Sequence, residues 1–501
     1  MTPGTYTISE NLVAQSSQTI EMAMGVIVQS AAGKNWKDSG LLDISSKQDV
    51  QVVGGGIDGN KANNKAGRAF GIRALSSQNI TLDRVQIRDC AGSDPRGTNG
   101  GDGWTVYGAS MRFQAFGVLS EGNVRNNASI VQVDGACVIG GFYDSSSGDN
   151  PGCGIDIEAD ESSQPIFDTA IIGVGMRGNH RALQIAHYSS GTEVMGCALR
   201  NSRAGDLLIA SCDTVGFIGN HLKSQPTLPE SNVVNVVNSS RIRFIGNDIA
   251  GSSRPNEAAG MFVQHNVKSI VISGCIFSGT KEYGLRIGHV AMPADVEEVI
   301  ITDCIFLNCV DPALDLPVIY FEGNATAAKY PRRVVVRNNI CVDQRAGGDA
   351  AAAFLKISTH IPDSVISEYD IGDNYIVGTT ARYINCPNEG SFTATLTGCS
   401  SQPTGSIGYS RSGDGTVTLQ MPAITGKSNS TAATITGMPA YLRPASPQTV
   451  FAVNHDDGTE KISRDIISTS GVITLHNALS ASFSRSGTKG CGSCTVTYRR
   501  V

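Results

Sequence analysis

A short turn sequence recurs at nearly regular intervals along the middle of the chain, and it constrains the fold more than any other feature. A glycine, aspartate or asparagine is followed by a cysteine or an asparagine at residues 196–197, 219–220, 246–247, 274–275, 303–304, 338–339 and 373–374. Successive second positions are 23, 27, 28, 29, 35 and 35 residues apart. A sequence period of roughly 20 to 50 residues indicates a repeat architecture, in which each unit buries its apolar face against its neighbours.

The repeat unit has the composition of strands. Short runs of β-branched residues precede most of the turns, and a second ladder of apolar residues lies between them at Ile157, Ile185, Ile209, Val236, Val263 and Ile287. A unit of this length holds about three short strands and three bends. The 3.6-residue pattern that ankyrin-like or leucine-rich repeats require is missing. The sequence therefore predicts an all-β chain with a right-handed parallel β-helix, in which asparagine and cysteine side chains occupy the same inward turn position in successive coils.

The two ends of the chain differ from the repeat. Residues 1–50 are expected to form an irregular lead-in that caps the helix, and residues 51–385 to form the β-helix itself. The repeat then fails, which predicts a linker over 386–404. From 405 to 501 the strands alternate polar and apolar residues, as in 416–422 and 471–475, and this pattern is typical of a small antiparallel β-sandwich.

Charge and composition exclude several classes of function. The net charge of -6 and the pI near 5.8 provide no basic surface for nucleic acid, and no apolar run approaches the roughly 20 residues that cross a bilayer. The first residues carry no secretory signal, so we expect either a protein that folds in a cytoplasm or a sequence that is a fragment. The thirteen cysteines are best explained as small buried side chains. Cys491 and Cys494 form a single C-x-x-C pair without a second one, so neither a metal site nor a cofactor is expected.

The candidate catalytic residues lie in one strand-like stretch, residues 154–160. Alternation along a strand directs Ile155 and Ile157 inward and places Asp156 and Glu158 side by side on the outer face. Two neighbouring carboxylates repel each other, and a site that holds them is a candidate for acid and base chemistry. Glycoside hydrolysis commonly uses such a pair. The spacing does not distinguish a retaining from an inverting reaction, and the alternative is a solvated strand face that at most binds sugar.

Further candidates follow from stacking the coils about 4.8 Å apart. Tyr107 and Gln184 are expected beside the two carboxylates, provided that residues 104–107 form the preceding coil, with Trp104 pointing inward. Arg181, His187 and Tyr188 flank this patch at the strand ends. Asp160, Glu161 and Asp206 are alternative carboxylate partners or sugar ligands. Each has a structural alternative, such as a turn cap for His187 or a covered coil edge for Tyr107.

The quoted residues also resemble a known family. The lead-in at 3–6, the coils, the GIDIEAD stretch after a glycine-rich loop, and the tail at 408–411, 442–444, 488–490 and 498 are similar to bacteriophage tailspike depolymerases with a pectate-lyase-like β-helix. The resemblance implies a homotrimer that binds and cleaves a bacterial surface polysaccharide, either capsule or O-antigen. It also implies a virion-tail protein that acts outside the host, attached to the baseplate or tail through an N-terminal head that this sequence does not contain.

Three functions remain open on the sequence alone. The leading hypothesis is an endo-glycoside hydrolase that uses Asp156 and Glu158. A polysaccharide lyase would instead need a uronic acid substrate, a base such as Tyr107 or His187, and a cation such as Arg181. The third possibility is a non-catalytic trimeric adhesin that only binds glycan.

Overall fold

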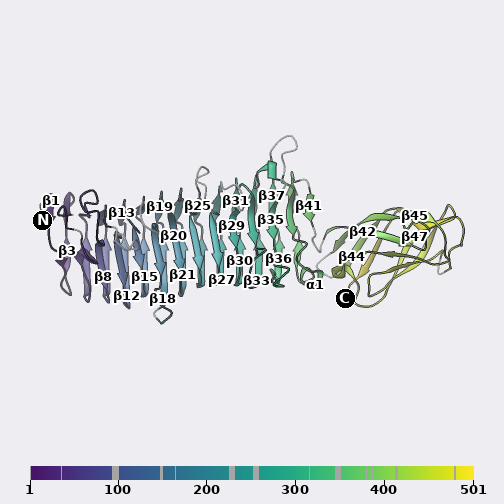
Figure 1. Cartoon of the computed structure of the whole chain (residues 1–501), viewed down its shortest axis with the longest axis horizontal. Helices are drawn as coiled ribbons and strands as arrows, with labels where there is room; N and C mark the ends of the chain where they lie inside the picture. The colour runs from purple at the N-terminus through teal and green to yellow at the C-terminus, as the bar shows by residue number, and fades with distance from the viewer. Residues whose placement is uncertain are drawn as a thin grey trace.

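The computed structural model is elongated, with a long stack of strands followed by a separate C-terminal sheet (Figure 1). It describes the chain except for residues 1, 35, 93–100, 147–150, 164, 225–231, 252–258, 315, 345–350, 380, 385–388, 412–415, 479–480 and 501. Helix is limited to α1 (Asp363–Ile366) and two 3-10 turns, η1 (Pro312–Leu314) and η2 (Ala440–Leu442), within these described ranges. None of these helices is long and apolar enough to cross a bilayer.

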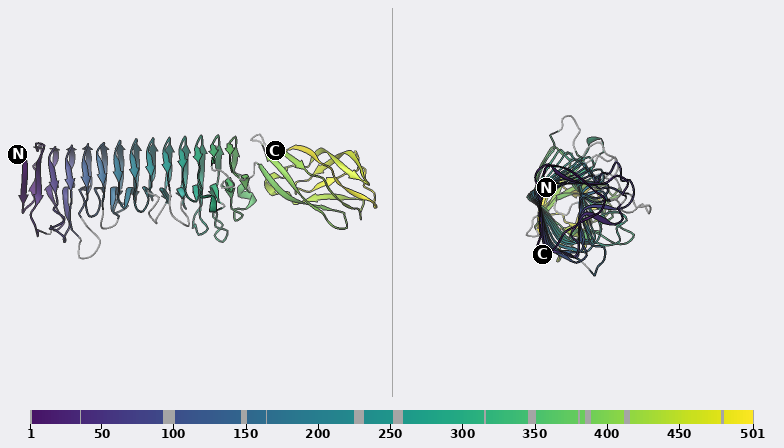
Figure 2. Two further views of the ribbon diagram at one scale, coloured as in Figure 1. Left: turned by 90° about the horizontal axis from the view of Figure 1, so that it is seen from above. Right: turned by 90° about the vertical axis from the view of Figure 1, so that its left-hand side faces the viewer.

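The stack consists of three parallel sheets, and each coil contributes one strand to each of them in turn. Figure 2 shows the strands side by side along the axis and, end-on, the faces that they form. Sheet A contains β1 (Gly4–Ile8), β4 (Val26–Ser30), β7 (Gly56–Asp58), β10 (Gln86–Arg88), β13 (Leu119–Glu121), β16 (Phe142–Asp144), β19 (Gly175–Arg177), β22 (Ala198–Arg200), β25 (His221–Lys223), β28 (Asp248–Ala250), β31 (Ile276–Ser278), β34 (Ile305–Leu307), β37 (Ile340–Val342) and β40 (Tyr375–Val377).

Sheet B, which carries the candidate site, contains β2 (Leu12–Val13), β5 (Ser39–Asp43), β8 (Ala69–Leu75), β11 (Trp104–Tyr107), β14 (Ala128–Ile130), β17 (Cys153–Glu158), β20 (Arg181–Ala186), β23 (Leu207–Ala210), β26 (Val234–Val237), β29 (Ala259–Val263), β32 (Tyr283–Ile287), β35 (Pro317–Phe321), β38 (Ala353–Ile357) and β41 (Ala381–Ile384). Sheet C contains β3 (Thr19–Glu21), β6 (Gln48–Val53), β9 (Gln78–Asp83), β12 (Ser110–Phe116), β15 (Val133–Ile139), β18 (Ile166–Ile172), β21 (Ser189–Met195), β24 (Asp213–Ile218), β27 (Ser240–Ile245), β30 (Val267–Ser273), β33 (Val296–Thr302), β36 (Val334–Arg337) and β39 (Asp370–Gly372).

The helix begins earlier than the sequence pattern indicates. β1 already pairs in parallel with β4, so the coils start at Gly4 and the stretch 1–50 is largely part of the stack. The apolar content of this first stretch is low, and β1 is mostly exposed along its length. The regular coil is therefore set there by backbone pairing with the next coil, which a search for apolar periodicity does not detect.

The recurrent turn connects sheet C to sheet A and has the predicted construction. Gly196, Gly219 and Gly246 have φ of 61°, 62° and 63°, which glycine adopts without the steric penalty of a side chain. The next residue points inward, and Asn220 donates from Nδ2 to Oδ1 of Asn247 at 3.0 Å. The same amide ladder recurs between Asn339 and Asn374 at 3.0 Å. Stacked amides thus satisfy buried polar groups at this corner.

Inside the helix, side chains stack in register from coil to coil. The rings of Phe217 and Phe244 stack with their centroids 5.2 Å apart, and those of Phe277 and Phe306 at 4.9 Å. Trp104 is fully buried, as the alternation predicts. The cysteines in the described part of the chain are free thiols, and most of them are buried.

The C-terminal unit is a ten-stranded antiparallel sheet. Its strands are β42 (Glu389–Thr397), β43 (Thr404–Arg411), β44 (Thr416–Met421), β45 (Ile424–Lys427), β46 (Ala433–Thr436), β47 (Gln448–Asp456), β48 (Thr459–Ile467), β49 (Ile473–Leu475), β50 (Thr488–Cys491) and β51 (Cys494–Arg499). β42 pairs with β43 and β46, so most of the stretch predicted as a linker, 386–404, belongs to this sheet. β42 follows soon after β41, the last strand of the coils, so the sequence pattern places the start of the C-terminal sheet too late.

Candidate active site

The predicted carboxylates lie on the outer face of sheet B, in a row of residues aligned by strand pairing. Asp156 on β17 is in register with Ser129 on β14 and with Gln184 on β20. Ile155 and Ile157 are fully buried on the opposite face of the strand. The predicted alternation is therefore confirmed, and so is the position of Gln184 beside the carboxylates.

Asp156 is deeply placed in this row, with an exposed fraction of 1%. Its Oδ2 accepts a hydrogen bond from Nδ2 of Asn126 at 2.9 Å, and its Oδ1 accepts one from Nε2 of Gln184 at 3.1 Å. Burial, reinforced by the nearby Glu158 carboxylate, raises the pKa of Asp156 to about 7. A carboxyl group with this pKa is partly protonated at neutral pH and can donate a proton.

Glu158 occupies the shallower position, where 29% of its side chain is exposed. Its Oε2 accepts from the same Gln184 Nε2 at 3.1 Å. The nearest oxygens of the two carboxyl groups are therefore at most twice this distance apart. On the other side, Nε2 of His187 lies 3.2 Å from Oε1 of Glu158, and 53% of the histidine side chain is exposed. Glu158 and His187 are thus the groups of this site that a surface ligand reaches first.

Two residues that the sequence did not identify support Asp156 from the two preceding coils. The guanidinium of Arg125 lies 3.4 Å from Oδ2 of Asp102 and 4.0 Å from Oδ2 of Asp156. Asp102 is fully buried, accepts from the Ser129 hydroxyl at 2.9 Å, and raises the pKa of Arg125. No local sequence pattern around Asp102 or Arg125 predicts that they lie beside Asp156.

Tyr107 is not next to the carboxylates, because an additional coil intervenes. β11 pairs with β14, and β14 pairs with β17, so Tyr107 lies two coils from Asp156. Its hydroxyl instead accepts from Nε of Arg73 at 2.6 Å. The assumption that residues 104–107 form the preceding coil was wrong, since β14 has only three residues and follows a polar turn that conceals it in the sequence.

The remaining predicted residues divide into three groups. Arg181 donates from Nη1 to Oε1 of Gln184 at 2.6 Å and so lies at the patch, and Tyr188 is half exposed with its ring centroid 6.5 Å from that of His187. Asp160 and Glu161 are exposed just beyond the end of β17.

Asp206 does not reach the outer surface at all. It is fully buried, and its Oδ1 accepts from the Ser202 backbone N–H at 3.2 Å. Because a ligand on the outer face cannot touch it, Asp206 is not a member of this site.

The arrangement brings two carboxyl groups into different environments on one rigid strand. One is desolvated and has a raised pKa, whereas the other is partly solvated and paired with an imidazole. Carboxyl pairs whose environments separate them in this way can divide the roles of acid and base. Among the described residues, no group of three or more His, Cys, Asp or Glu side chains could hold a metal ion.

Comparisons with known proteins support the architecture. A model of the right-handed β-helix region family matches residues 153–353. No curated protein sequence matches the chain. The A-module of the Azotobacter vinelandii mannuronan C-5 epimerase AlgE6 is similar in structure, with a TM-score of 0.51, 12% identity, and coverage of 69% of this chain and 90% of the module.

Two further similar structures have TM-scores below 0.5. The Dettilon tailspike protein has a TM-score of 0.48 and 13% identity, with coverage of 98% of this chain and 86% of the tailspike. The catalytic domain of a GH87 α-1,3-glucanase has a TM-score of 0.38 and 9% identity, with coverage of 76% and 63%. The three parallel sheets, whose coils include the matched residues 153–353, give this chain the fold of a right-handed parallel β-helix that is followed by an antiparallel β-sheet domain.

Proposed function

We propose that this protein cleaves a polysaccharide by endo-glycosidic hydrolysis at the Asp156–Glu158 pair. The observation that carries the proposal is the shared contact of both carboxyl groups with Gln184, combined with the pKa of about 7 to which burial raises Asp156. In this reaction Asp156 protonates the leaving oxygen as general acid, and ionised Glu158 acts as base or nucleophile. Because Asp156 is nearly covered, the sugar displaces the Gln184 amide from its position over the two carboxyl groups.

The proposed substrate class is supported by the linear arrangement of polar residues at the site. The row on sheet B runs along the stack through Arg73, Thr105, Ser129, Asp156 and Gln184, in register from coil to coil. Such a polar track suits a chain of sugars better than a small ligand, which prefers an enclosed and mostly apolar pocket. A fold of this kind also forms the A-module of an enzyme named for mannuronan. A bacterial surface polysaccharide, either capsule or O-antigen, is the proposed substrate.

The proposal includes action as a phage tailspike, assembled as a homotrimer on the virion tail and acting outside the host. An exposed apolar row on sheet C supports self-association: Ile139, Ile218 and Ile245 are 37%, 36% and 39% exposed. Phe116, Ile172 and Met195 belong to the same row, because strand pairing places them in register with these isoleucines on neighbouring strands. An exposed apolar stripe of this length is typical of a protein interface.

The test measures release of reducing ends from a panel of capsules and lipopolysaccharides. Asp156→Asn and Glu158→Gln should each lower the rate by roughly 10²- to 10⁴-fold, the usual contribution of an acid or base. Asp134→Asn and Glu121→Gln are matched controls, because both side chains are exposed on other sheets. Full activity in the double variant Asp156→Asn/Glu158→Gln would remove the site assignment.

A lyase is the second candidate, favoured by the exposed His187 held by Glu158 and by Arg181 near the same patch. In β-elimination, His187 would remove the proton next to a uronate whose carboxylate Arg181 neutralises. This general-base elimination leaves a carbon–carbon double bond, so its product absorbs ultraviolet light at about 235 nm. A hydrolysis product does not absorb there. Binding without any product would instead indicate an adhesin.

A further inference from the structure

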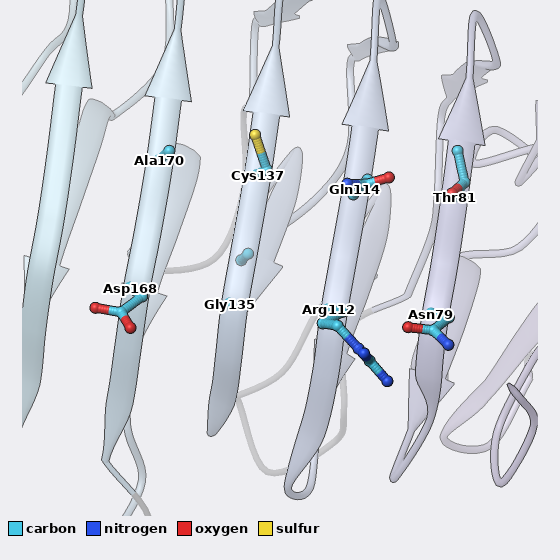
Figure 3. Close-up of a pocket in the computed structure, with 9 residues that line it drawn as sticks. Asn79, Thr81, Arg112, Gln114, Gly135, Cys137, Asp168 and Ala170 are labelled. Carbon is cyan, nitrogen blue, oxygen red and sulfur yellow. The ribbon is translucent and has the colours of Figure 1, made fainter. Parts of the chain in front are cut away.

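A polar cleft lies on a different face of the stack from the candidate active site, on the outer surface of sheet C. It has a volume of about 330 Å³ and is formed by β9, β12, β15 and β18 (Figure 3). Its polar lining consists of Asn79, Thr81, Arg112, Gln114 and Asp168. Since the carboxylate pair is on sheet B, this cleft is separate from the candidate active site.

The cleft exists because one position in a row of aligned outward residues on sheet C is a glycine and has no side chain. Asn79, Arg112, Gly135 and Asp168 follow one another on successive strands, and all four have positive φ, between 50° and 74°. A Cβ atom built on Gly135 would have no neighbour closer than 4.0 Å. The surface is therefore open between Arg112 and Asp168, whose strands lie roughly 10 Å apart, or two strand spacings.

A similar arrangement three strands further along shows what closes such a gap. Glu193 and Arg243 flank Gly216 in register, and their side chains meet over it, with Nη2 of Arg243 2.5 Å from Oε1 of Glu193. Within the described ranges, Arg112 and Asp168 form no ion pair. In Figure 3 they extend to opposite sides of the strand that carries Gly135.

Asp168 turns away because the neighbouring strand provides room for it. A Cβ atom on Gly191 would lie 2.7 Å from Oδ1 of Asp168, so the carboxylate occupies the space over that glycine. The cleft is thus left with a cationic group on one side, an acceptor on the other, and the amide of Gln114 along its wall. Its volume is at the lower end of the range for ligand sites, about 300 to 1,000 Å³.

We propose that this cleft binds the acidic sugar unit of a polyanionic glycan, with the sugar carboxylate on the Arg112 guanidinium. An arginine forms charge-assisted, bidentate hydrogen bonds with a planar carboxylate. On the far side, sugar hydroxyl groups donate to Asp168, while Asn79 and Gln114 supply amides. A bare inorganic anion fits less well, because it would leave the Asp168 side of the cleft unfilled and would be repelled by that carboxylate. The cleft holds the glycan without cleaving it.

The test uses the full chain with trigalacturonate as probe and maltotriose as its neutral counterpart, measured by isothermal titration calorimetry. Arg112→Gln should weaken trigalacturonate binding about tenfold or more, the effect of losing a hydrogen-bonded charge. Arg333→Gln is the matched control, since it removes the same charge from the same ladder but from a residue paired with Glu297 and Glu298. Gly135→Asn should also weaken binding by filling the cleft, because asparagine tolerates positive φ.

The background for these variants is Asp156→Asn/Glu158→Gln, which separates the cleft from the active site. Retained binding in this background with loss on Arg112→Gln supports the cleft even if the proposed hydrolysis fails. The proposal is overturned if the protein binds maltotriose as tightly as trigalacturonate or binds neither. Equal affinities of the Arg112→Gln and Arg333→Gln variants for trigalacturonate would also overturn it.

Discussion

At the scale of single residues, two buried aspartates, Asp156 and Asp206, should have the largest effects on activity and stability. Burial raises the pKa of each to about 7, but their surroundings differ. Asp156 lies beside a second carboxylate and an arginine on the outer face of sheet B. Asp206 is enclosed, and its Oδ2 has no hydrogen-bond partner among the described residues. The first residue is suited to proton transfer, whereas the second affects stability alone.

The proposed acid role makes the reaction sensitive to pH. Asp156 donates a proton only while protonated, so the hydrolysis rate should fall as pH rises through about 7. Initial rates measured across this range should show the falling limb for the parent and for the Asp134→Asn control. Residual activity of Asp156→Asn should lack that limb, and an unchanged limb would contradict the assignment.

Asp206 should make the fold less stable as the solution becomes less acidic. The pKa of Asp206 is raised in the folded state. Its contribution to the free energy of unfolding is therefore fully present below the pKa of the unfolded chain, about 4, and is lost as pH rises to about 7. The loss is on the order of 4 kcal/mol in unfolding free energy.

Asp206→Asn should remove this loss. Denaturant unfolding of parent and variant at about pH 4 and about pH 8 checks the prediction, since the difference between the two proteins should change with pH. Parallel stability curves would show that Asp206 is not the titrating group. Hydrolysis by the variant should be unaffected.

At the scale of elements, the turn between sheets C and A keeps the coils in register. Its inward asparagines connect one coil to the next: Asn220 donates to Val194 O at 2.9 Å, and its Oδ1 accepts from the Cys197 backbone N–H at 2.8 Å. A slip by one residue would move every apolar side chain of a strand to the outer face. The turn therefore helps to hold successive coils from Cys197 to Asn247 in register.

Removing one member of this amide ladder should destabilise the helix measurably. Asn220→Ala leaves the Cys197 N–H and the Val194 carbonyl without their buried partner, which costs about 1 to 3 kcal/mol for each group left unsatisfied. The midpoint of denaturant unfolding should fall accordingly. Gln86→Ala, at an exposed position of β10, is the control and should leave the midpoint unchanged. Equal midpoints would show that the ladder contributes no stability.

At the scale of the whole molecule, sheets B and C present different chemistry. Sheet B presents the carboxylate row, and sheet C presents both the cleft at Gly135 and the apolar row through Ile139, Ile218 and Ile245. The C-terminal sheet also exposes Phe451 and Ile462, at 65% and 68%. Isolated exposed apolar residues are ordinary, but aligned rows of them favour association.

If the apolar row is the interface, the protein in solution should have three times the 52.5 kDa mass of one chain. Light scattering coupled to size exclusion measures this mass directly. Ile218→Glu/Ile245→Glu should reduce it to that of a monomer, because a charge buried without a partner opposes association. Val290→Glu, at an exposed apolar position elsewhere, should retain the trimer. A monomeric parent would exclude the homotrimer.

The sequence by itself determined the features that repeat locally. The glycine-asparagine and glycine-cysteine turns predicted the coils, and alternation predicted that Ile155 and Ile157 point inward while Asp156 and Gln184 lie side by side. Both predictions depend on strand periodicity, which can be read from residues that are close together in the sequence.

Only the tertiary structure decided how many coils separate Tyr107 from Asp156, how deep Asp156 lies, and that Arg125 and Asp102 support it. β14 contributes just three residues, too few to show a period, and burial depends on side chains that approach from other coils. The carboxylate pair predicted from sequence thus separates into a covered Asp156 and an accessible Glu158, because stacking, and not alternation, sets the depth of each side chain.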